Sequence, residues 1–250
     1  MSSKSETGHA INVANFEELI SFCKGFGASY NPSKDALLIK NLEILHTTAK
    51  DGLQKTITTK TSFDIATNER KIAFKDLKPL ATKIINALAV SGASPLTLLN
   101  AKTINRKIQG TKASVTSIAP PPTSQPTEEV ATIKNISSSQ QSFDSMVEHF
   151  TKLIENLLQD GFYKPNETAL QTVTLQARLS GLKNANSLSI NAFTNWSNAR
   201  LQRNSIVYNP LTGLIQTALD IKKYVKSVFD SGSPEFKQIS SLEFTNLKGN

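Results

Sequence analysis

The stretch YNPSKDALLIKNLEILHTTAKDGL, residues 30–53, is matched far downstream by YKPNETALQTVTLQARLSGLKNANSL, residues 163–188. Each begins with Tyr-x-Pro and a polar residue, then continues into a leucine-rich amphipathic run. An apolar stripe at steps of three and four residues is typical of a helix with one buried face. Each stretch therefore predicts the start of a long helix, with Tyr30 or Tyr163 packed where a short preceding helix turns into it.

The residues after each tyrosine favour this helix start. Ser33 and Asn166 are good helix N-caps, because their side chains can accept a hydrogen bond from a backbone N–H of the first turn. Asp35 and Glu167 follow where the helix dipole favours a negative charge. We expect the helices to begin near these caps.

Further markers recur in the same order in the two halves of the chain. They are Val13, Phe16, Ile20 and Cys23 against Val147, Phe150, Ile154 and Leu157; Asn68-Glu69-Arg70 against Asn198-Ala199-Arg200; Pro79-Leu80 against Pro210-Leu211; and Ser91-Gly92-Ala93-Ser94-Pro95 against Ser231-Gly232-Ser233-Pro234. Five markers in one order predict a divergent duplication.

The predicted fold is all-α: two tandem duplicated antiparallel helical bundles, with about four helical segments in each repeat. We expect repeats over residues 12–110 and 142–250 and a disordered tail over residues 1–11. Residues 111–141 hold three consecutive prolines and a Ser/Gln tract, which predict a Pro/Ser-rich linker because little apolar surface offsets the entropy of ordering.

The first long segment leaves one ambiguity. A single helix could run from about Ser33 to about Asp76, but residues 58–62, TTKTS, are poor helix formers. We expect a hairpin or sharp break there, with the single helix as the alternative. Pro79 and Pro210 are expected to kink or restart their helices, because proline lacks the backbone N–H donor.

Composition favours a soluble cytoplasmic protein with an aliphatic core. Hydrophobic residues make up 38% of the 250, and aromatic residues only 7%. No apolar run has the length of a secretory signal or of a membrane-spanning helix. The single cysteine, Cys23, has no internal disulfide partner and falls on an apolar stripe, which predicts a core position.

The formal net charge is +8, and the excess lies in the first half: 16 Lys and Arg against 9 Asp and Glu in residues 1–119, and 12 against 11 in the rest. Basic clusters could neutralise phosphates, although a solvated basic face is the simpler interpretation. The clusters are Arg70, Lys71, Lys75 and Lys78, and Lys102, Arg106, Lys107 and Lys112.

A third basic segment, Lys222, Lys223 and Lys226, surrounds Tyr224, Val225, Val228 and Phe229. Such a segment could lie on a membrane surface. Alternation of this kind is also typical of a bundle helix with one buried face, and we favour the bundle.

No residue is predicted from the sequence to be catalytic, cofactor-binding or metal-binding. Glu43 and His46 have the Glu-x-x-His spacing of di-iron bundles, but the aligned residues Gln176 and Leu179 do not repeat it. His9, in the expected tail, and His149 have no partner at catalytic or ligand spacing. The two Ser-Gly segments are interpreted as a helix end followed by a Ser-Pro helix start, in preference to a phosphate loop.

Taken together, the pattern resembles a group of uncharacterised two-repeat helical proteins from Bacteroidota-type bacteria. The segments that carry this resemblance are GHAINVANFEELISFC, YNPS, SGAS, TINRKIQG, YKPNE, SNAR and YNPLTGLIQTALDIKKYVKSVF. It covers nearly the whole chain except the linker. It implies a soluble, all-helical, duplicated protein, and it implies no activity or cofactor.

We therefore expect a non-enzymatic interaction or structural protein that binds a protein partner or a second copy of itself. Three alternatives remain at this point: a nucleic-acid-associated protein using the basic first repeat, a metal-dependent enzyme built on Glu43 and His46, and a membrane-active helical protein.

Overall fold

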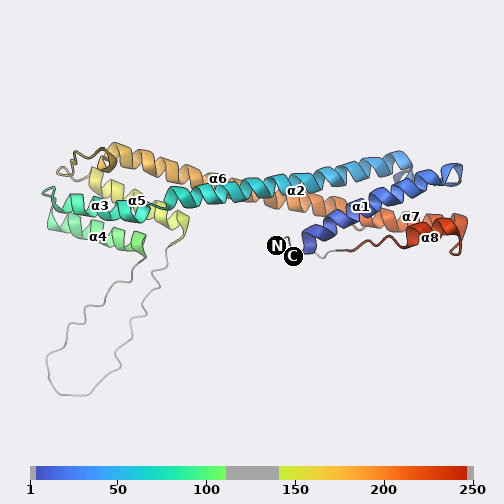
Figure 1. Cartoon of the computed structure of the whole chain (residues 1–250). Helices are drawn as coiled ribbons and strands as arrows, with labels where there is room; N and C mark the ends of the chain where they lie inside the picture. Colours follow the sequence, from blue (N-terminus) through green and yellow to red (C-terminus); the bar gives the residue numbers. More distant parts are fainter. Residues whose placement is uncertain (1–3, 111–140, 247–250) are drawn as a thin grey trace, which may run out of the picture. The chain divides into compact units, whose positions relative to one another are not determined.

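The computed structural model describes residues 4–110 and 141–246, and every regular element in these ranges is helical (Figure 1). The all-α prediction is thus confirmed. Apart from Gln141, the expected linker lies outside the described residues. The α-helices are α1 (Lys4–Gly25), α2 (Ile39–Phe74), α3 (Leu77–Ala89), α4 (Pro95–Gln109), α5 (Phe143–Leu158), α6 (Thr172–Tyr208), α7 (Leu214–Phe229) and α8 (Pro234–Ser240).

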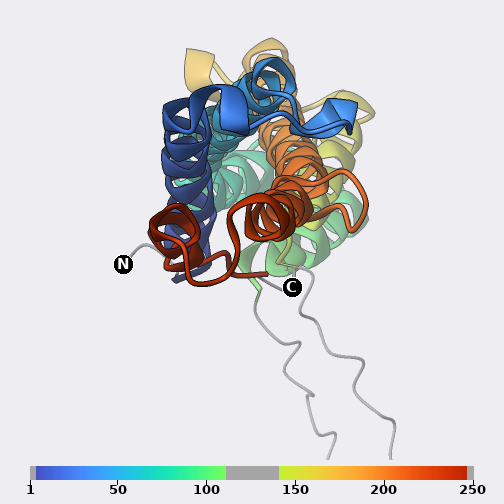
Figure 2. The same cartoon turned by 90° about the vertical axis from the view of Figure 1, so that its right-hand side faces the viewer.

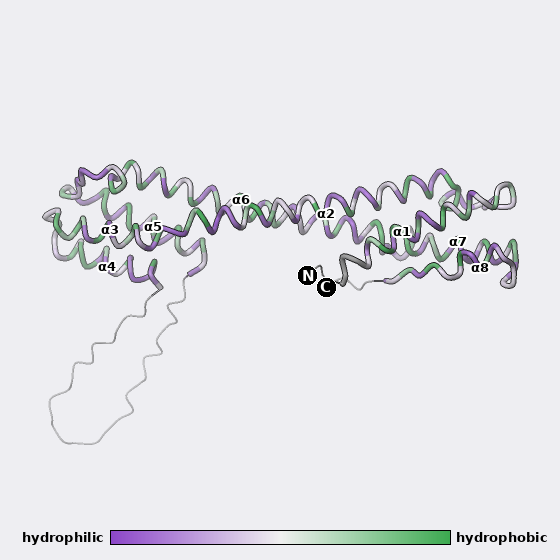
Figure 3. The backbone as a smooth tube through the Cα atoms, in the orientation of Figure 1, coloured by the Kyte–Doolittle hydropathy of each residue, from purple (hydrophilic) through white to green (hydrophobic). Residues whose placement is uncertain are grey.

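Short 3-10 turns precede the two longest helices. They are η1 (Gly27–Ser29) and η2 (Asp35–Leu37) before α2, and η3 (Thr168–Leu170) before α6. Hydrophobic and hydrophilic residues alternate along the helices (Figure 3), as expected when each helix buries one face.

The chain divides into two compact units that do not coincide with the expected repeats at 12–110 and 142–250. Unit 1 comprises Met1–Ile65 and Ile190–Asn250, and unit 2 comprises Ala66–Ser189. The boundaries differ because α2 and α6 each contribute residues to both units. Each unit therefore contains segments from both halves of the sequence.

Unit 1 is built on α1, α7 and α8, which contact one another (Figure 2). Its core also takes in Leu42 and Ala49 of α2 and Val207 of α6. The other buried hydrophobic residues of this core are Val13, Phe16, Leu19, Ile20, Cys23, Tyr30, Leu37, Leu214, Ile215, Ala218, Ile221, Val225, Ile239 and Leu242.

Unit 2 is built around α4, which packs against both α3 and α5. Phe74 of α2 and Leu175, Leu179 and Leu182 of α6 complete its core. The other buried hydrophobic residues are Leu77, Ala81, Ile84, Ile85, Leu88, Ala101, Ile108, Met146, Phe150, Leu153, Ile154, Leu157 and Tyr163. Two separate cores explain why the chain forms two units.

The expected disordered tail is wrong for the residues that the structure describes, because α1 begins at Lys4. Two polar side chains of its first turns are buried in unit 1. His9 contacts the Tyr208 hydroxyl, and Asn12 forms hydrogen bonds of 2.8 and 2.9 Å with the backbone of Thr245. These partners lie about 200 residues away, so local sequence could not reveal them.

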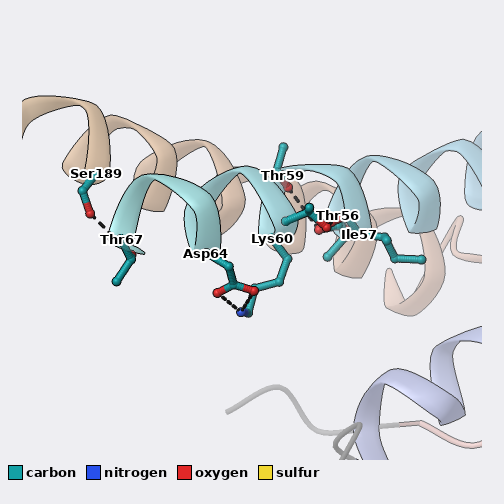
Figure 4. Close-up of polar contacts among 8 residues, drawn as sticks. Thr56, Ile57, Thr59, Lys60, Asp64, Thr67 and Ser189 are labelled. Atoms are coloured by element: carbon teal, nitrogen blue, oxygen red, sulfur yellow. Dashed lines mark hydrogen bonds and ion pairs between the residues drawn. The ribbon is translucent and has the colours of Figure 1, made fainter. Parts of the chain in front are cut away.

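The expected hairpin near residues 58–62 is also wrong, because α2 runs unbroken for 36 residues. Its hydroxyl residues donate to carbonyl oxygens one turn back: Thr59 to Lys55 at 2.8 Å, and Ser62 to Thr58 at 3.1 Å. Figure 4 shows part of this stretch, including Thr59 beside Thr56. The hydroxyl groups that weaken helix propensity in isolation are thus satisfied within the helix.

The Tyr-x-Pro segments form a joint that differs from the expected one. Ser33 and Asn166 do not cap a helix; a 3-10 turn intervenes, and α2 and α6 begin only at Ile39 and Thr172. The joint is held by the tyrosines, which are buried as predicted. The Tyr30 hydroxyl donates to the Leu37 carbonyl at 2.8 Å, and Tyr163 donates in the same way to the carbonyl seven residues further on, at 3.0 Å.

The predicted helix boundaries at proline are confirmed. One helix ends and another begins within a few residues of Pro79 and of Pro210. Ser94 and Ser233 cap α4 and α8, each followed by proline as the first helical residue. Gly92, before α4, has φ of 90°, which a residue with a side chain rarely adopts.

The continuity of α2 yields a stability prediction. Thr58 is exposed, so replacing it by proline removes one backbone hydrogen bond and clashes with the preceding turn without disturbing the core. We expect Thr58→Pro to lower the free energy of unfolding by about 3 kcal/mol, measured by urea denaturation followed by circular dichroism. Thr58→Ala is the control and should stay close to wild type. Equal stability of the two variants would mean that the chain turns at this point.

Candidate interaction surface

An aromatic cluster lies where α2 and α6 meet within unit 1. Phe63 of α2 stacks on Trp196 of α6, with ring centroids 5.6 Å apart and planes at 11°. Phe193 lies 5.4 Å from Phe63 and 6.1 Å from Trp196. We call Phe63, Phe193 and Trp196 the aromatic patch.

Two cations flank the aromatic patch. The Lys60 ammonium is 5.4 Å from the Trp196 ring centroid, and the Arg200 guanidinium is 5.1 Å from it. Lys60 is held one turn before Phe63 and also pairs with Asp64 (Figure 4). A cation above an aromatic ring is attracted by the negative face of the ring.

The patch forms because helical spacing places its members on one face. Phe193 and Trp196 are three residues apart, and Arg200 follows one turn later. Phe193 is 49% exposed, and Ile190, one turn earlier, is 48% exposed. Aromatic residues and arginine are enriched in protein interfaces relative to the rest of the protein surface.

This patch is not predicted from the sequence. Residues 197–200, SNAR, contribute a repeat marker and part of the resemblance, and Trp196 has no assignment there. The one local indication is the spacing Phe193-x-x-Trp196, which places both rings on one face of a helix. The sequence does not show which helix packs against that face. Phe63, 133 residues earlier, is brought to it only by folding.

The Glu43 and His46 side chains each contact α1, and they do not share a binding site. The Glu43 carboxylate pairs with the Lys24 ammonium at 2.7 Å, and His46 Nε2 lies 3.8 Å from the Glu17 carboxylate. Within residues 4–110 and 141–246, no three His, Cys, Asp or Glu side chains gather in a group that could hold a metal ion.

His149 is buried on α5 in unit 2. Neither of its ring nitrogens has a hydrogen-bond partner among the described residues. Burial lowers the pKa of His149, and the nearby Lys107 ammonium lowers it further. Both effects favour the neutral form of the ring.

Cys23 occupies the core of unit 1, as predicted, with 1% of its surface exposed. Burial raises the pKa of its thiol to about 12. A thiol that stays protonated at neutral pH is a poor nucleophile.

Several members of the basic clusters make internal contacts. The Arg70 guanidinium lies 4.3 Å from the Phe143 ring centroid and donates to Asn186 at 3.1 Å, and Asn186 in turn donates to Asp144 at 2.6 Å. Lys78 donates to the Gln109 carbonyl at 3.2 Å. These charges are used in part for packing unit 2, which weakens the basis for a phosphate-binding face.

The basic segment of α7 belongs to the bundle, as favoured from sequence. Val225 is fully buried, and Tyr224 and Phe229 pack against the unit 1 core. Lys222 donates to the Ser240 and Leu242 carbonyls, and desolvation by burial lowers its pKa. Among the described helices, none has the length and apolar character needed to cross a membrane.

Comparison with family models, curated proteins and solved structures finds no match to this chain. The resemblance drawn from the sequence therefore remains a prediction. The class that the fold supports is an all-helical protein of two units.

The stack of Phe63 on Trp196 predicts a fluorescence change. Phe63→Ala removes the ring that covers one face of the only tryptophan, so we expect its emission to shift to longer wavelength and acrylamide quenching to increase. Ile72→Ala, an exposed aliphatic change on the same helix in unit 2, is the control and should leave both unchanged. Unchanged emission in Phe63→Ala would show that the two rings are not stacked.

His149 predicts a pH dependence of stability. Its pKa in the folded state lies below the ordinary value near 6.5, so the unfolded chain takes up the proton first. The stabilising contribution of the neutral ring is complete above about pH 6.5 and is lost as the pH falls below it. We expect His149→Leu to lose less stability than wild type between pH 7.5 and 5.5, measured by urea denaturation. Met146→Leu, one turn earlier, should keep the wild-type dependence, and identical slopes for all three proteins would contradict the assignment.

Proposed function

We propose that this chain is a non-enzymatic interaction protein, in the cytoplasm, whose aromatic patch binds a protein partner or a second copy of the chain. The single observation that carries the proposal is the aromatic patch with its two cations, in which Phe193 is exposed and Phe63 and Trp196 are half-buried. Aromatic rings that keep part of their surface in solvent can still bury it against a partner, and aromatic residues are among those that most often dominate binding energy.

The rigidity of the patch supports this function. Its residues stand on α2 and α6, the longest of the described helices, and Thr56, about two turns before Phe63, donates to the Gly52 carbonyl at 2.9 Å. Rings fixed by helices lose little conformational entropy on binding, so more of the contact energy appears as affinity.

We also propose that the two halves of the sequence arose by duplication of one helical repeat, which is distinct from the compact units 1 and 2. The helices correspond in order, α1 to α5, α2 to α6, α3 to α7 and α4 to α8, and each long helix follows a Tyr-x-Pro joint. The buried residues of α3 and α7 keep one register, Leu77 with Leu214, Ala81 with Ala218, Ile84 with Ile221 and Leu88 with Val225. This register replaces the pairing of Pro79 with Pro210, because α3 contains its proline and α7 does not.

The function is tested by quantitative affinity capture from a lysate of the source cells, together with light scattering of the purified chain. Wild type should recover one reproducible protein partner or self-associate. Phe193→Ser and Trp196→Ala should each weaken that association about tenfold or more, since loss of a central aromatic residue commonly costs over 1.4 kcal/mol.

Leu211→Ser is the matched control, because Leu211 is 80% exposed in unit 1 and lies outside the patch. It should associate like wild type. A monomer that captures no partner, or an association that the patch variants leave unchanged, would overturn the proposal.

A further inference from the structure

Unit 2 contains an open pocket of about 590 Å³ between α3 and the second Tyr-x-Pro joint. Ala87 of α3 and Val90, the residue after its end, line one side. Tyr163, Lys164 and Pro165 of the joint line the other, and Phe162 is 65% exposed beside them. A space of this size exceeds a single aromatic ring and admits the residues on either side of one.

In unit 1, a tyrosine side chain packs against the corresponding Tyr-x-Pro joint. There the Tyr224 ring of α7 packs edge-on against Tyr30, with ring centroids 5.3 Å apart and planes at 90°. The Tyr224 hydroxyl oxygen accepts a hydrogen bond of 3.0 Å from the backbone N–H of Asn31. The joint of unit 1 is therefore a receptor for a tyrosine side chain of its own chain.

Each part of this receptor has a counterpart in unit 2. Tyr163 corresponds to Tyr30, because both are buried and both donate to the carbonyl seven residues further on. The 3-10 turn of each joint contacts the corresponding helix, η2 with α7 and η3 with α3. In the register of the two helices, Ala87 stands at the position of Tyr224.

The pocket is consequently the space that a tyrosine ring fills in unit 1. Alanine at position 87 leaves that space open, and Lys164 takes the place of Asn31. The Lys164 backbone N–H has no hydrogen-bond partner among the described residues. The receptor in unit 2 thus keeps the aromatic wall and the N–H donor, while it lacks the side chain that occupies them in unit 1.

The charges beside the two receptors are exchanged. In unit 1, Lys34 of the joint pairs with Asp220 of α7 at 2.8 Å. In unit 2 the corresponding residues are Glu167 of the joint and Lys83 of α3, and both line the pocket. The rim therefore offers both an acidic and a basic group to a polar peptide backbone or to its neighbouring side chains.

We propose that the unit 2 pocket binds a tyrosine side chain of a partner protein, with its ring against Tyr163 and its hydroxyl oxygen accepting from the Lys164 N–H. That the pocket accepts a tyrosine ring is inferred from the comparison of the two joints. That the tyrosine belongs to a partner protein rests on the proposed function. The patch in unit 1 and this pocket are separate features.

The ring site is tested on the full chain with N-acetyltyrosinamide as the probe, observed by saturation-transfer and chemical-shift NMR. Wild type should bind the probe at one site, and N-acetylphenylalaninamide should bind several-fold more weakly because it lacks the hydroxyl. N-acetylleucinamide is the negative control. Absence of binding, or equal binding of all three amides, would overturn the proposal.

Two reciprocal variants locate the site. Ala87→Tyr supplies the ring from α3, so it should abolish probe binding and raise the Tm. Tyr224→Ala empties the receptor of unit 1, so it should raise the number of sites from one to two. Ala87→Leu fills the pocket with a smaller side chain and should also block the probe, which keeps the test valid if Ala87→Tyr does not fold. Full probe binding by Ala87→Leu and Ala87→Tyr would overturn the assignment.

The source of the tyrosine is tested in the affinity capture described above. Recovery of the partner by Ala87→Tyr should fall several-fold, whereas probe binding by Phe193→Ser should stay at the wild-type level. Loss of capture in Phe193→Ser with intact probe binding separates the patch from the pocket. If Ala87→Tyr recovers the partner as well as wild type does, the tyrosine does not come from that partner, even if the wild-type chain binds the amide probe.

Discussion

The unbroken course of α2 and α6 is the constraint on which the rest of the structure depends. Each helix contributes buried residues to both cores. The aromatic patch has the same requirement, because Phe63 meets Trp196 only while both helices keep their register. Hydroxyl groups that bond back to carbonyls one turn earlier let α2 pass through a threonine-rich stretch without losing hydrogen bonds.

The two Tyr-x-Pro joints share the same local hydrogen bonding but face different side chains. In both, the tyrosine hydroxyl donates to the carbonyl of the last residue of the 3-10 turn. What differs is the helix that faces the joint. A tyrosine at position 224 completes the packing in unit 1, and an alanine at position 87 leaves a pocket in unit 2.

Polar residues decide much of the internal order of each unit. Asn12 binds both the N–H and the carbonyl of Thr245, as a neighbouring strand would, and so holds the segment after α8 against α1. In unit 2, Arg70, Asn186 and Asp144 form a chain of hydrogen bonds that joins α2, α6 and α5. Such networks stabilise one arrangement of helices because each buried donor needs its own acceptor.

The sequence by itself determined the helical class, the buried tyrosines, the core position of Cys23 and the Ser-Pro starts of α4 and α8. All of these follow from local rules, namely apolar periodicity, capping and the missing N–H of proline. Only the tertiary structure decided the continuity of α2, the helical start at Lys4, the division into units, the aromatic patch and the pocket beside Ala87. Apart from the continuity of α2, each of these depends on residues more than 70 positions apart, whose pairing is set by packing and leaves no periodic signal in either segment.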